Sequence, residues 1–323
     1  MGTDKPRISI LMAVYEPRMD WLREQLMSLN DQTYPNLRLY IREDCSPTAP
    51  YEQIQSCVQD CITRFPYTIT RNEKNLGSNG TFELLTQEAD GDLFAYCDQD
   101  DVWLPEKLTV LQEAMEREQA RLVCSDMYII DGNGKQVAGS ITKVRRHHVF
   151  RSGRDLAEGL LTHNFVTGCT MLVQSDAAKR AIPFCPYMVH DHYIALCCAA
   201  EGMVYSSPGK TICYRIHGGN QTGIMSGVRD KESYLNVRIS AVEEKLRWLE
   251  KYFPYHDDLN KSIHRRLRWV HARRENWQKK GHASELWQLR DCGRQVTLYE
   301  ILAARLPEKL FMRTINLARK NVI

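Results

Sequence analysis

The sequence contains no long apolar run. Hydrophobic residues make up 43% of the chain, but no stretch approaches the roughly 18 consecutive apolar residues that a membrane-spanning helix requires. The polar segment 1–7 leads directly into an apolar run, so we expect no secretory signal peptide. These absences predict a protein that is soluble or peripheral to a membrane.

Three common site motifs are also missing. The sequence has neither GxGxxG nor GxxxxGKS, so neither a dinucleotide-binding fold nor a P-loop is indicated. No pair of closely spaced cysteines is matched by a second Cys pair or a His pair, which argues against a structural zinc site. The 11 cysteines include Cys97, Cys124 and Cys213 within apolar runs. They are typical of small core residues in a reducing compartment, and we therefore expect a cytoplasmic location.

Apolar runs without helical period alternate with helical periodicity through the first third of the chain. We expect strands at residues 8–15, 37–42, 67–70 and 94–96, and helices at 21–29, 51–65 and 81–89. Farther along, we expect strands at 122–130, 164–173 and 204–214, a hairpin turn at 131–134 and a helix that begins near residue 190. This alternation predicts an α/β protein with a mostly parallel central sheet covered by helices on both faces.

A short apolar run, Phe94–Cys97, leads directly into the carboxylates of Asp98, Asp100 and Asp101. Carboxylates packed this closely repel one another, so a divalent cation or a ring of hydrogen-bond donors is needed to keep them ionised. Mg²⁺ or Mn²⁺, held by one or two carboxylates and by substrate phosphates, fits such a cluster. The alternative is that the aspartates cap a helix that begins at Pro105.

Polar residues follow each of the first four predicted strands. Tyr15 and Glu16 follow the first strand, Asp44 the second, the segment 71–80 the third, and the aspartates the fourth. Ligands of parallel sheets bind beyond the carboxyl ends of the strands, so these loops predict a nucleotide site. Asp44 could accept a hydrogen bond from a base N–H, and the glycines of 75–80 would let the backbone approach a ligand closely.

Two later polar segments each have two interpretations. Asp191, between two histidines at the start of a predicted helix, either caps that helix or serves the chemistry of the site. The Gly-rich segment 215–223, with Arg215 and His217, either closes over a bound anion or is a mobile surface loop. The residue pattern alone leaves both pairs of alternatives open.

Charge is distributed unevenly along the chain. The net charge is +3, but residues 230–323 carry 20 Lys and Arg against 12 Asp and Glu, a balance of +8, which leaves −5 for residues 1–229. We therefore expect one domain at 1–229 and a basic helical region at 230–323. An amphipathic helix near 307–321 either lies on an anionic membrane surface or docks on its own domain. The tryptophans of this region suit a helical core better than nucleobase stacking, so we expect no nucleic-acid partner.

Five motifs together resemble the family 2 glycosyltransferases. They are Ser9–Tyr15, Arg42–Ser46, Arg71–Gly77, Cys97–Asp101 and His190–Tyr193. They occur in the family's order within residues 8–223, and the resemblance implies the family's GT-A fold, with a Rossmann-like nucleotide-binding half, followed here by a C-terminal helical extension. The Asp-Gln-Asp-Asp form of the acidic motif, together with segment 214–222, is similar to the bacterial rhamnosyltransferase branch. Cys45 departs from the family's pattern, which commonly has glycine there.

The resemblance implies a donor site with defined roles. The donor-binding residues that it implies are Ala13, Tyr15, Glu16, Asp44, Asn75, Gly77, Asp98, Gln99, Arg215 and His217. Asp44 would bind the pyrimidine base, with Tyr15 and Glu16 lining its pocket. His217, together with Arg215, would fold over the diphosphate.

The resemblance also implies the metal ligands and the catalytic base. Asp98 and Asp100 would form the acid-x-acid motif that holds Mg²⁺ or Mn²⁺, with Asp100 as the direct ligand and Asp101 in support. The metal would neutralise the departing diphosphate. Asp191 would take the proton from the acceptor hydroxyl as it attacks the anomeric carbon from the opposite face, which inverts the configuration.

These implications lead to one expected function and several alternatives. We expect an inverting, metal-dependent glycosyltransferase that moves sugar from dTDP-L-rhamnose to a glycan or lipid-linked acceptor of a bacterial surface polysaccharide, at the inner face of the cell membrane. A UDP-hexose or UDP-N-acetylhexosamine donor is the nearest alternative. A nucleotidyltransferase and a noncatalytic polyanion-binding protein are alternatives from other classes.

Overall fold

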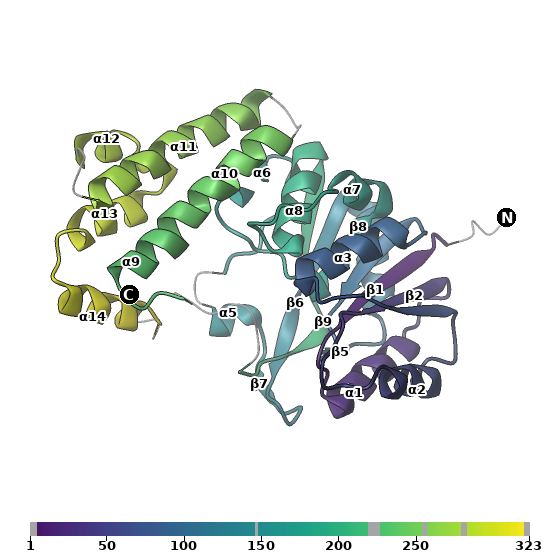
Figure 1. The fold of residues 1–323 in the computed structure, drawn as a ribbon. Coiled ribbons are helices and arrows are strands. Elements are labelled where there is room, and N and C mark those ends of the chain that lie inside the picture. The colour runs from purple at the N-terminus through teal and green to yellow at the C-terminus, as the bar shows by residue number, and fades with distance from the viewer. Residues whose placement is uncertain (1–4, 146–147, 219–226, 254–256, 279–282, 320–323) are drawn as a thin grey trace. The chain divides into compact units, whose positions relative to one another are not determined.

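The computed structural model describes residues 5–145, 148–218, 227–253, 257–278 and 283–319. They divide into two compact units, an α/β unit of residues 1–184 with 188–218 and a helical unit of residues 185–187 with 219–323 (Figure 1). The expected boundary at residue 229 stays a prediction. The segment 219–223, expected to belong to an anion-binding loop, lies outside the described residues.

Four parallel strands form one half of the sheet. They are β1 (Ile8–Val14), β2 (Leu37–Glu43), β3 (Tyr67–Arg71) and β4 (Leu93–Cys97), in the order β3-β2-β1-β4. The helices α1 (Met19–Asn30), α2 (Tyr51–Cys61) and α3 (Gly77–Glu88) connect them. Helix α3 begins at Gly77 rather than at the expected residue 81, because the carboxylate of Asp44 accepts the N–H groups of Leu76 and Gly77, which a helix start leaves unpaired.

The second half of the sheet is mixed. Its strands are β5 (Val102–Trp103), β6 (Ala120–Ile130), β8 (Leu172–Gln174) and β9 (Met203–Arg215), in the order β4-β8-β6-β9-β5. Strand β8 runs antiparallel to both neighbours, whereas β6 and β9 are parallel. Strand β7 (Gln136–Ala138) pairs with β6 across the expected turn at 131–134. The longest ladders are parallel, as the alternation of strands and helices predicts.

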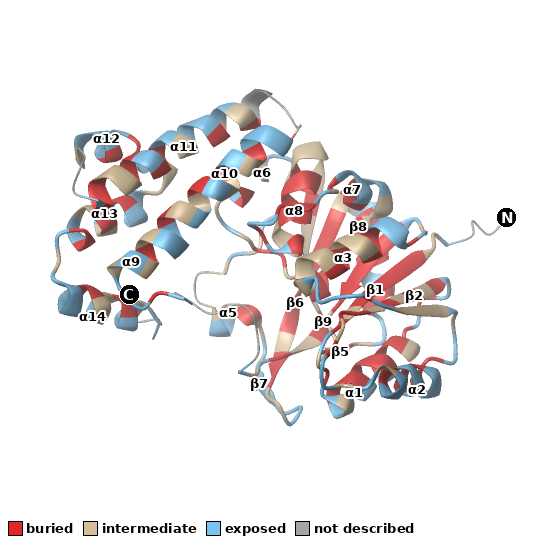
Figure 2. Ribbon diagram, viewed as in Figure 1, coloured by how far each residue is buried: buried red, intermediate tan, exposed pale blue. Residues whose placement is uncertain are grey.

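Helices cover both faces of this sheet. In addition to α1, α2 and α3, the α/β unit contains the helices α4 (Lys107–Glu118), α5 (Ile141–Val144), α6 (Ala157–Leu160), α7 (Ser175–Arg180) and α8 (His190–Glu201). Helices α1 and α2 pack together, α3, α7 and α8 form a second group, and Figure 1 shows the two groups on opposite sides of the sheet. Every residue of β4 is buried, and Figure 2 shows mostly buried strands between the two groups of helices. Residues 98–101, which we call the acidic loop, follow β4 and therefore begin at the centre of the core.

The expected strand at residues 164–173 is wrong for most of its length. A short 3-10 helix at Gly168–Thr170 replaces it, and only its last residues join β8. The N–H of Gly168 donates to the carboxylate of Asp191 at 2.9 Å, so it is not available to a neighbouring strand. A Cβ at Gly168 would also lie only 2.8 Å from Nε2 of His190. A contact with a distant helix therefore overrides the local strand pattern.

The helical unit has a separate apolar core. Its elements are α9 (Lys231–Tyr234), a π-helical turn (Leu235–Ser240), α10 (Ala241–Tyr252), α11 (Asp257–Trp277), α12 (Ala283–Gln288), a 3-10 helix (Arg290–Cys292), α13 (Arg294–Ala303) and α14 (Glu308–Arg319). Trp277 stacks on Tyr234 with ring centroids 4.7 Å apart, and Trp269 donates a hydrogen bond to Thr297. These two tryptophans are core residues, as expected, whereas the same expectation is wrong for Trp287, which is 44% exposed at the end of a short helix. In the part of the chain that is described, no helix is both long and apolar enough to cross a membrane.

A buried ion pair lies in the middle of this core. Nε and Nη2 of Arg273 donate to the carboxylate of Glu300 at 2.7 and 2.6 Å. The Tyr234 hydroxyl donates to the same carboxylate at 2.9 Å, which also keeps the pKa of that phenol above its usual range, after the larger effect of burial. The side chains of Arg273 and Glu300 are only 5% and 0% exposed, so neither charge can be rehydrated if its partner is removed.

We predict that Arg273→Met lowers the free energy of unfolding of the helical unit by about 3–5 kcal/mol, because it leaves the Glu300 carboxylate buried without its cation. Urea unfolding followed by tryptophan fluorescence measures this change. The matched control is Arg265→Met, whose partner Asp291 is exposed, and it should cost at most about 1 kcal/mol. Equal effects of the two substitutions would show that the buried pair does not stabilise this core.

Candidate active site

The carboxyl ends of four strands meet at one edge of the sheet. In the parallel register, Val14 of β1 lies beside Glu43 of β2, and Glu43 lies beside Arg71 of β3. On the other side of β1, Met12 lies beside Cys97 at the end of β4. The polar segments that follow these strands therefore surround a common region, which is the position of ligand sites in parallel sheets.

Gln99 of the acidic loop is bonded to the backbone at the end of β1. Its Oε1 accepts the N–H of Tyr15 at 2.8 Å, and its Nε2 donates to the Tyr15 carbonyl at 2.9 Å. The amide thus pairs with Tyr15 in the way that a neighbouring strand would. The Tyr15 side chain remains 43% exposed and available to a ligand. The implied donor-binding role of Gln99 stays a prediction, and the observed contact makes it a positioning residue for Tyr15.

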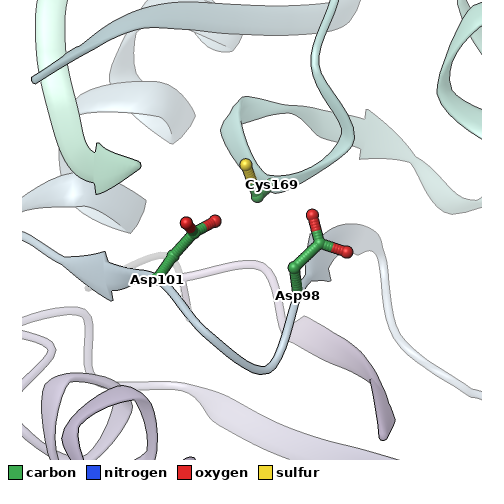
Figure 3. A group of neighbouring side chains, drawn as sticks. All are labelled: Asp98, Asp101 and Cys169. Carbon is green, nitrogen blue, oxygen red and sulfur yellow. The ribbon is translucent and has the colours of Figure 1, made fainter. Parts of the chain in front are cut away.

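Asp98 and Asp101 converge with Cys169. One potential ligand atom from each lies within 4.8 Å of the others, and Figure 3 shows the two carboxylates and the thiol pointing toward one another. Burial and then the charge of Asp100 raise the pKa of Asp101 to about 7. Burial, followed by the charges of Asp101 and Asp100, raises the pKa of Asp98 well above its usual range. The cluster is therefore costly to ionise without a compensating cation.

Arg215 donates two hydrogen bonds to the acidic loop. Its backbone N–H donates to Oδ1 of Asp101 at 2.9 Å, and its Nε donates to the Asp100 carbonyl at 2.7 Å. The side chain is 1% exposed, and its Nη2 pairs with Glu24 at 2.5 Å. The guanidinium is therefore buried against the acidic loop. Its implied contact with a diphosphate stays a prediction.

Asp100 pairs with His217. Its Oδ2 lies 2.8 Å from Nε2 of His217, and the imidazole ring packs on Trp21 with centroids 5.0 Å apart. His217 comes from the segment after β9, so the pair joins two loops at the same sheet edge. Asp100 as the direct metal ligand stays a prediction, and His217 is the nitrogen donor that lies beside it.

The donor set of this loop fits a hard divalent cation. Oδ2 of Asp101 is buried and accepts no hydrogen bond from a nitrogen or oxygen donor of the described residues. Such an orphaned oxygen, in a cluster of mutually repelling carboxylates, is what a cation would satisfy. Carboxylate oxygens suit Mg²⁺ and Mn²⁺. The Cys169 thiol is a soft ligand, which these hard cations disfavour, and burial holds its pKa well above its usual range.

Lys107 places a buried ammonium against this cluster. Its Nζ donates to the Cys169 carbonyl and lies 3.2 Å from the centroid of the Trp103 ring. Burial lowers its pKa to about 8, although the nearby charges of Asp101 and Asp98 act in the opposite direction. The lysine therefore supplies positive charge to the acidic loop from the side of α4.

Asp191 lies in the first turn of α8. Its Oδ1 accepts Nδ2 of Asn164 at 3.1 Å and its Oδ2 accepts the N–H of Gly168 at 2.9 Å. Burial raises its pKa to about 6, and these donors limit the rise. The charge of Asp191 in turn helps to raise the pKa of Asp98, so the two carboxylates are within electrostatic reach. A half-buried carboxylate of this kind is ionised at neutral pH and able to accept a proton.

Asn79 of α3 fixes the start of α8. Its Oδ1 accepts the N–H of His190 at 2.8 Å and its Nδ2 donates to the Met188 carbonyl at 2.5 Å. His190 itself packs on Phe82, with ring centroids 4.2 Å apart, and burial lowers its pKa to about 3. It is therefore a neutral core residue, and the adjacent Asp191 is the side chain of this motif that is left for chemistry.

Two of the implied base-pocket residues are engaged with protein groups. The carboxylate of Asp44 accepts Nδ2 of Asn72 and the N–H groups of Leu76 and Gly77 at 2.7–2.8 Å, so it shapes the loop 72–77. The carboxylate of Glu16 accepts the N–H of Thr48 at 2.8 Å. Both roles in base binding stay predictions.

The remaining implied donor residues are placed at the same edge. Ala13 lies at the end of β1, and Asn75 lies in the loop shaped by Asp44, where its Oδ1 accepts the N–H of Gly77 at 3.1 Å. Gly77 has φ +71°, a conformation that glycine adopts without strain. Cys45 has φ +57°, which accounts for the glycine common in the family at this position.

Several residues that build the site were not recognised in the sequence. They are Lys107 of α4, and Asn164 and Cys169 of the segment 164–173. Lys107 looks like an ordinary residue of the first turn of a helix, and single asparagines and cysteines occur throughout the chain. A charge at a position that the helical pattern assigns to the core is the one signal that Lys107 offers.

Comparison with known proteins gives consistent matches. The profile described as glycosyl transferase family 2 matches residues 9–180. An uncharacterized glycosyltransferase of Methanocaldococcus jannaschii is 31% identical over 132 residues, which are 41% of this chain and 45% of that protein. One of Nostoc sp. is 24% identical over 225 residues, 66% of each chain. The chain thus spans less than two thirds of the length of either relative.

Solved structures share the fold. Residues 1–349 of Staphylococcus aureus TarS, in complex with UDP-GlcNAc, superpose with a TM-score of 0.58 at 14% identity, over 98% of this chain and 88% of that chain. The mannosyltransferase PcManGT of Pyrobaculum calidifontis, in complex with GDP-Man and Mn²⁺, gives 0.56 at 12% identity, over 98% and 81%. At these identities the likeness establishes the GT-A fold, as expected.

We predict that Lys107→Met lowers the free energy of unfolding of the metal-free α/β unit by on the order of 3 kcal/mol, because the carboxylates lose their buried counter-charge. Mn²⁺ should raise the melting temperature of the variant more than that of the wild type, since the cation compensates the same carboxylates. Differential scanning fluorimetry with and without Mn²⁺ measures both. Lys135→Met, at an exposed position, is the control. An unchanged melting temperature for Lys107→Met would contradict the assigned role.

Proposed function

This chain belongs to glycosyl transferase family 2, and from that premise we propose that it transfers a sugar from a nucleoside diphosphate donor to an acceptor hydroxyl with inversion. The observation that carries the proposal is the arrangement of Asp191 relative to the acidic loop. The charge of Asp191 acts on Asp98, so a proton-accepting carboxylate lies within electrostatic reach of a carboxylate cluster suited to a cation. These are the two groups that a single displacement at an anomeric carbon requires.

Asp191 is the proposed general base. The acceptor oxygen attacks the anomeric carbon, its proton passes to Asp191, and the bond from that carbon to the diphosphate oxygen breaks with its electron pair on the diphosphate. One displacement inverts the configuration. The Asn164 and Gly168 donors orient the carboxylate, and burial keeps its pKa at about 6, high enough for proton transfer and low enough for ionisation at neutral pH.

The acidic loop is the proposed binding site for the donor diphosphate. Asp98 and Asp101 would hold Mg²⁺ or Mn²⁺, together with Asp100, which His217 contacts. When bound, the cation supplies electrostatic stabilisation of the leaving diphosphate. Lys107 and the N–H of Arg215 keep the carboxylates in place.

The proposed donor is dTDP-L-rhamnose. The Asp-Gln-Asp-Asp form of the acidic motif and the segment 214–222 support it through their likeness to the rhamnosyltransferase branch. The second candidate is a UDP-sugar, which the fold shared with the UDP-GlcNAc complex of TarS supports. GDP-mannose, the ligand of PcManGT, is a further donor to test. The proposed acceptor is a glycan or lipid-linked saccharide of bacterial surface polysaccharide synthesis, reached from the cytoplasmic side.

We predict that Asp191→Asn lowers kcat by roughly 10²- to 10⁴-fold and leaves donor binding within about twofold, because only proton transfer is lost. In the wild type, kcat/KM should fall about tenfold per pH unit below pH 6, since the carboxyl is protonated below its pKa of about 6. Asp31→Asn, exposed at the end of α1, is the control for both measurements. Full turnover by Asp191→Asn with donor bound would rule out this base.

We predict that dTDP-L-rhamnose with Mn²⁺ raises the melting temperature more than UDP-glucose, UDP-GlcNAc or GDP-mannose. A donor at about 100 times its Kd stabilises the protein by roughly 2.7 kcal/mol. Asp101→Asn should abolish the Mn²⁺-dependent part of the shift. A larger shift with another donor would replace rhamnose by that sugar. Release of pyrophosphate from a nucleoside triphosphate, without sugar transfer, would instead identify a nucleotidyltransferase.

A further inference from the structure

The outward faces of α13 and α14 carry a group of exposed aliphatic side chains. They are Val296, Leu298, Leu302, Leu310 and Leu317, with exposed fractions of 37%, 42%, 69%, 44% and 42%. We refer to these residues, together with Tyr299 and Thr314 between them, as the α13–α14 surface. Single exposed leucines are ordinary, but five large aliphatic side chains on two adjoining helices form a feature that needs an explanation.

Two rows of side chains make this surface continuous. Val296, Tyr299 and Leu302 follow one another at spacing three along α13, and Leu310, Thr314 and Leu317 follow at spacing four and three along α14, so each row lies on one side of its helix. The Tyr299 hydroxyl and Thr314 Oγ1 lie 2.8 Å apart, which joins the middle of one row to the middle of the other.

Of these side chains, Tyr299 also packs against the core of the helical unit, whereas the five aliphatic ones are exposed. Helix α13 turns Thr297, Glu300 and Ala303 inward, and α14 turns Phe311 and Ile315 inward. These inward side chains anchor the two helices. The exposed parts of the aliphatic side chains are apolar surface that the unit leaves to water.

The charge around these rows is positive. Arg294, Arg305, Lys309 and Arg313 are exposed on or between the two helices. Both acids of residues 294–319 are engaged: Glu300 is buried against Arg273, and Glu308 accepts the backbone N–H of Lys231 at 2.9 Å. The outward-facing charge that remains is therefore mainly cationic.

We propose that the α13–α14 surface binds an anionic lipid bilayer, with the leucines entering the acyl boundary and the basic side chains contacting lipid phosphates. Apolar area and cationic charge on one helical face are the two terms that determine binding of this kind. A second copy of the chain fits less well, because a twofold contact would bring the same cations together. Binding can be measured without turnover, so the inference stands independently of the proposed sugar transfer.

The test is sedimentation of the full-length protein with vesicles. We expect binding to phosphatidylcholine vesicles that contain phosphatidylglycerol, much weaker binding to pure phosphatidylcholine, and a loss of binding at high salt. Leu302→Ser combined with Leu317→Ser should lower the partition coefficient roughly tenfold. Lys309→Gln combined with Arg313→Gln should lower it about fivefold for each charge removed.

Matched controls lie on the α/β unit. Met27→Ser, at an aliphatic position 53% exposed on α1, and Lys135→Gln should leave the partition coefficient unchanged. Circular dichroism and melting temperature verify that each variant is folded. The charge variant keeps the inference testable if the serine variant is unstable.

Three results would overturn the inference. One is absence of sedimentation with anionic vesicles, and another is equal binding by the wild type and both α13–α14 variants. The third is a concentration-dependent dimer that the serine variant disrupts, without vesicle binding, which would make the surface an interface between copies. If vesicle binding is found but no donor sugar is transferred, the proposed function fails and the lipid surface remains.

Discussion

Burial of carboxylates at the end of β4 is the constraint on which the α/β unit depends. Asp98 and Asp101 raise each other's cost of ionisation, and neither can be rehydrated inside the core. Positive charge and hydrogen-bond donors therefore come from separate parts of the chain: Lys107 from α4 and the N–H of Arg215 from β9. The acidic loop holds its shape only when these distant elements are in place, so the contacts that complete the sheet also build the site.

The carboxylate of Asp191 is also positioned by contacts between distant parts of the chain. Asp191 begins a helix, but the groups that orient it, Asn164 and the N–H of Gly168, precede it in the chain by more than a helical turn. Asn79 of α3 anchors that helix start, and the neutral ring of His190 fills the space beneath it. Burial then sets the pKa of Asp191 near 6, a value that suits a general base at neutral pH. Hydrogen bonds thus set the position of the Asp191 carboxylate, and burial raises its pKa.

The helical unit separates its charges in a different way. One ion pair, Arg273 with Glu300, is enclosed by aromatic rings and orders the core. Most of the remaining cations lie outside, and on α13 and α14 they border aliphatic side chains that no described residue covers. Because Glu300 is paired with Arg273 and Glu308 is the one exposed acid described on those helices, the outward charge is mainly positive. An anionic surface would compensate this charge, and a bilayer would also remove the leucines from water.

The sequence by itself determined the strands β1 to β4 and the sheet edge where their loops meet, because apolar periodicity and turn residues are local signals. It also identified Asp191 and the acidic motif as candidate site residues, through their resemblance to a known family. Only the tertiary structure decided what these residues contact. Arg215 donates to Asp101 and to the Asp100 carbonyl. Lys107 belongs to no motif, and residues 164–173 fail to form the expected strand because Asp191 takes the N–H of Gly168. Such contacts join positions far apart in the chain, and local periodicity carries no information about them.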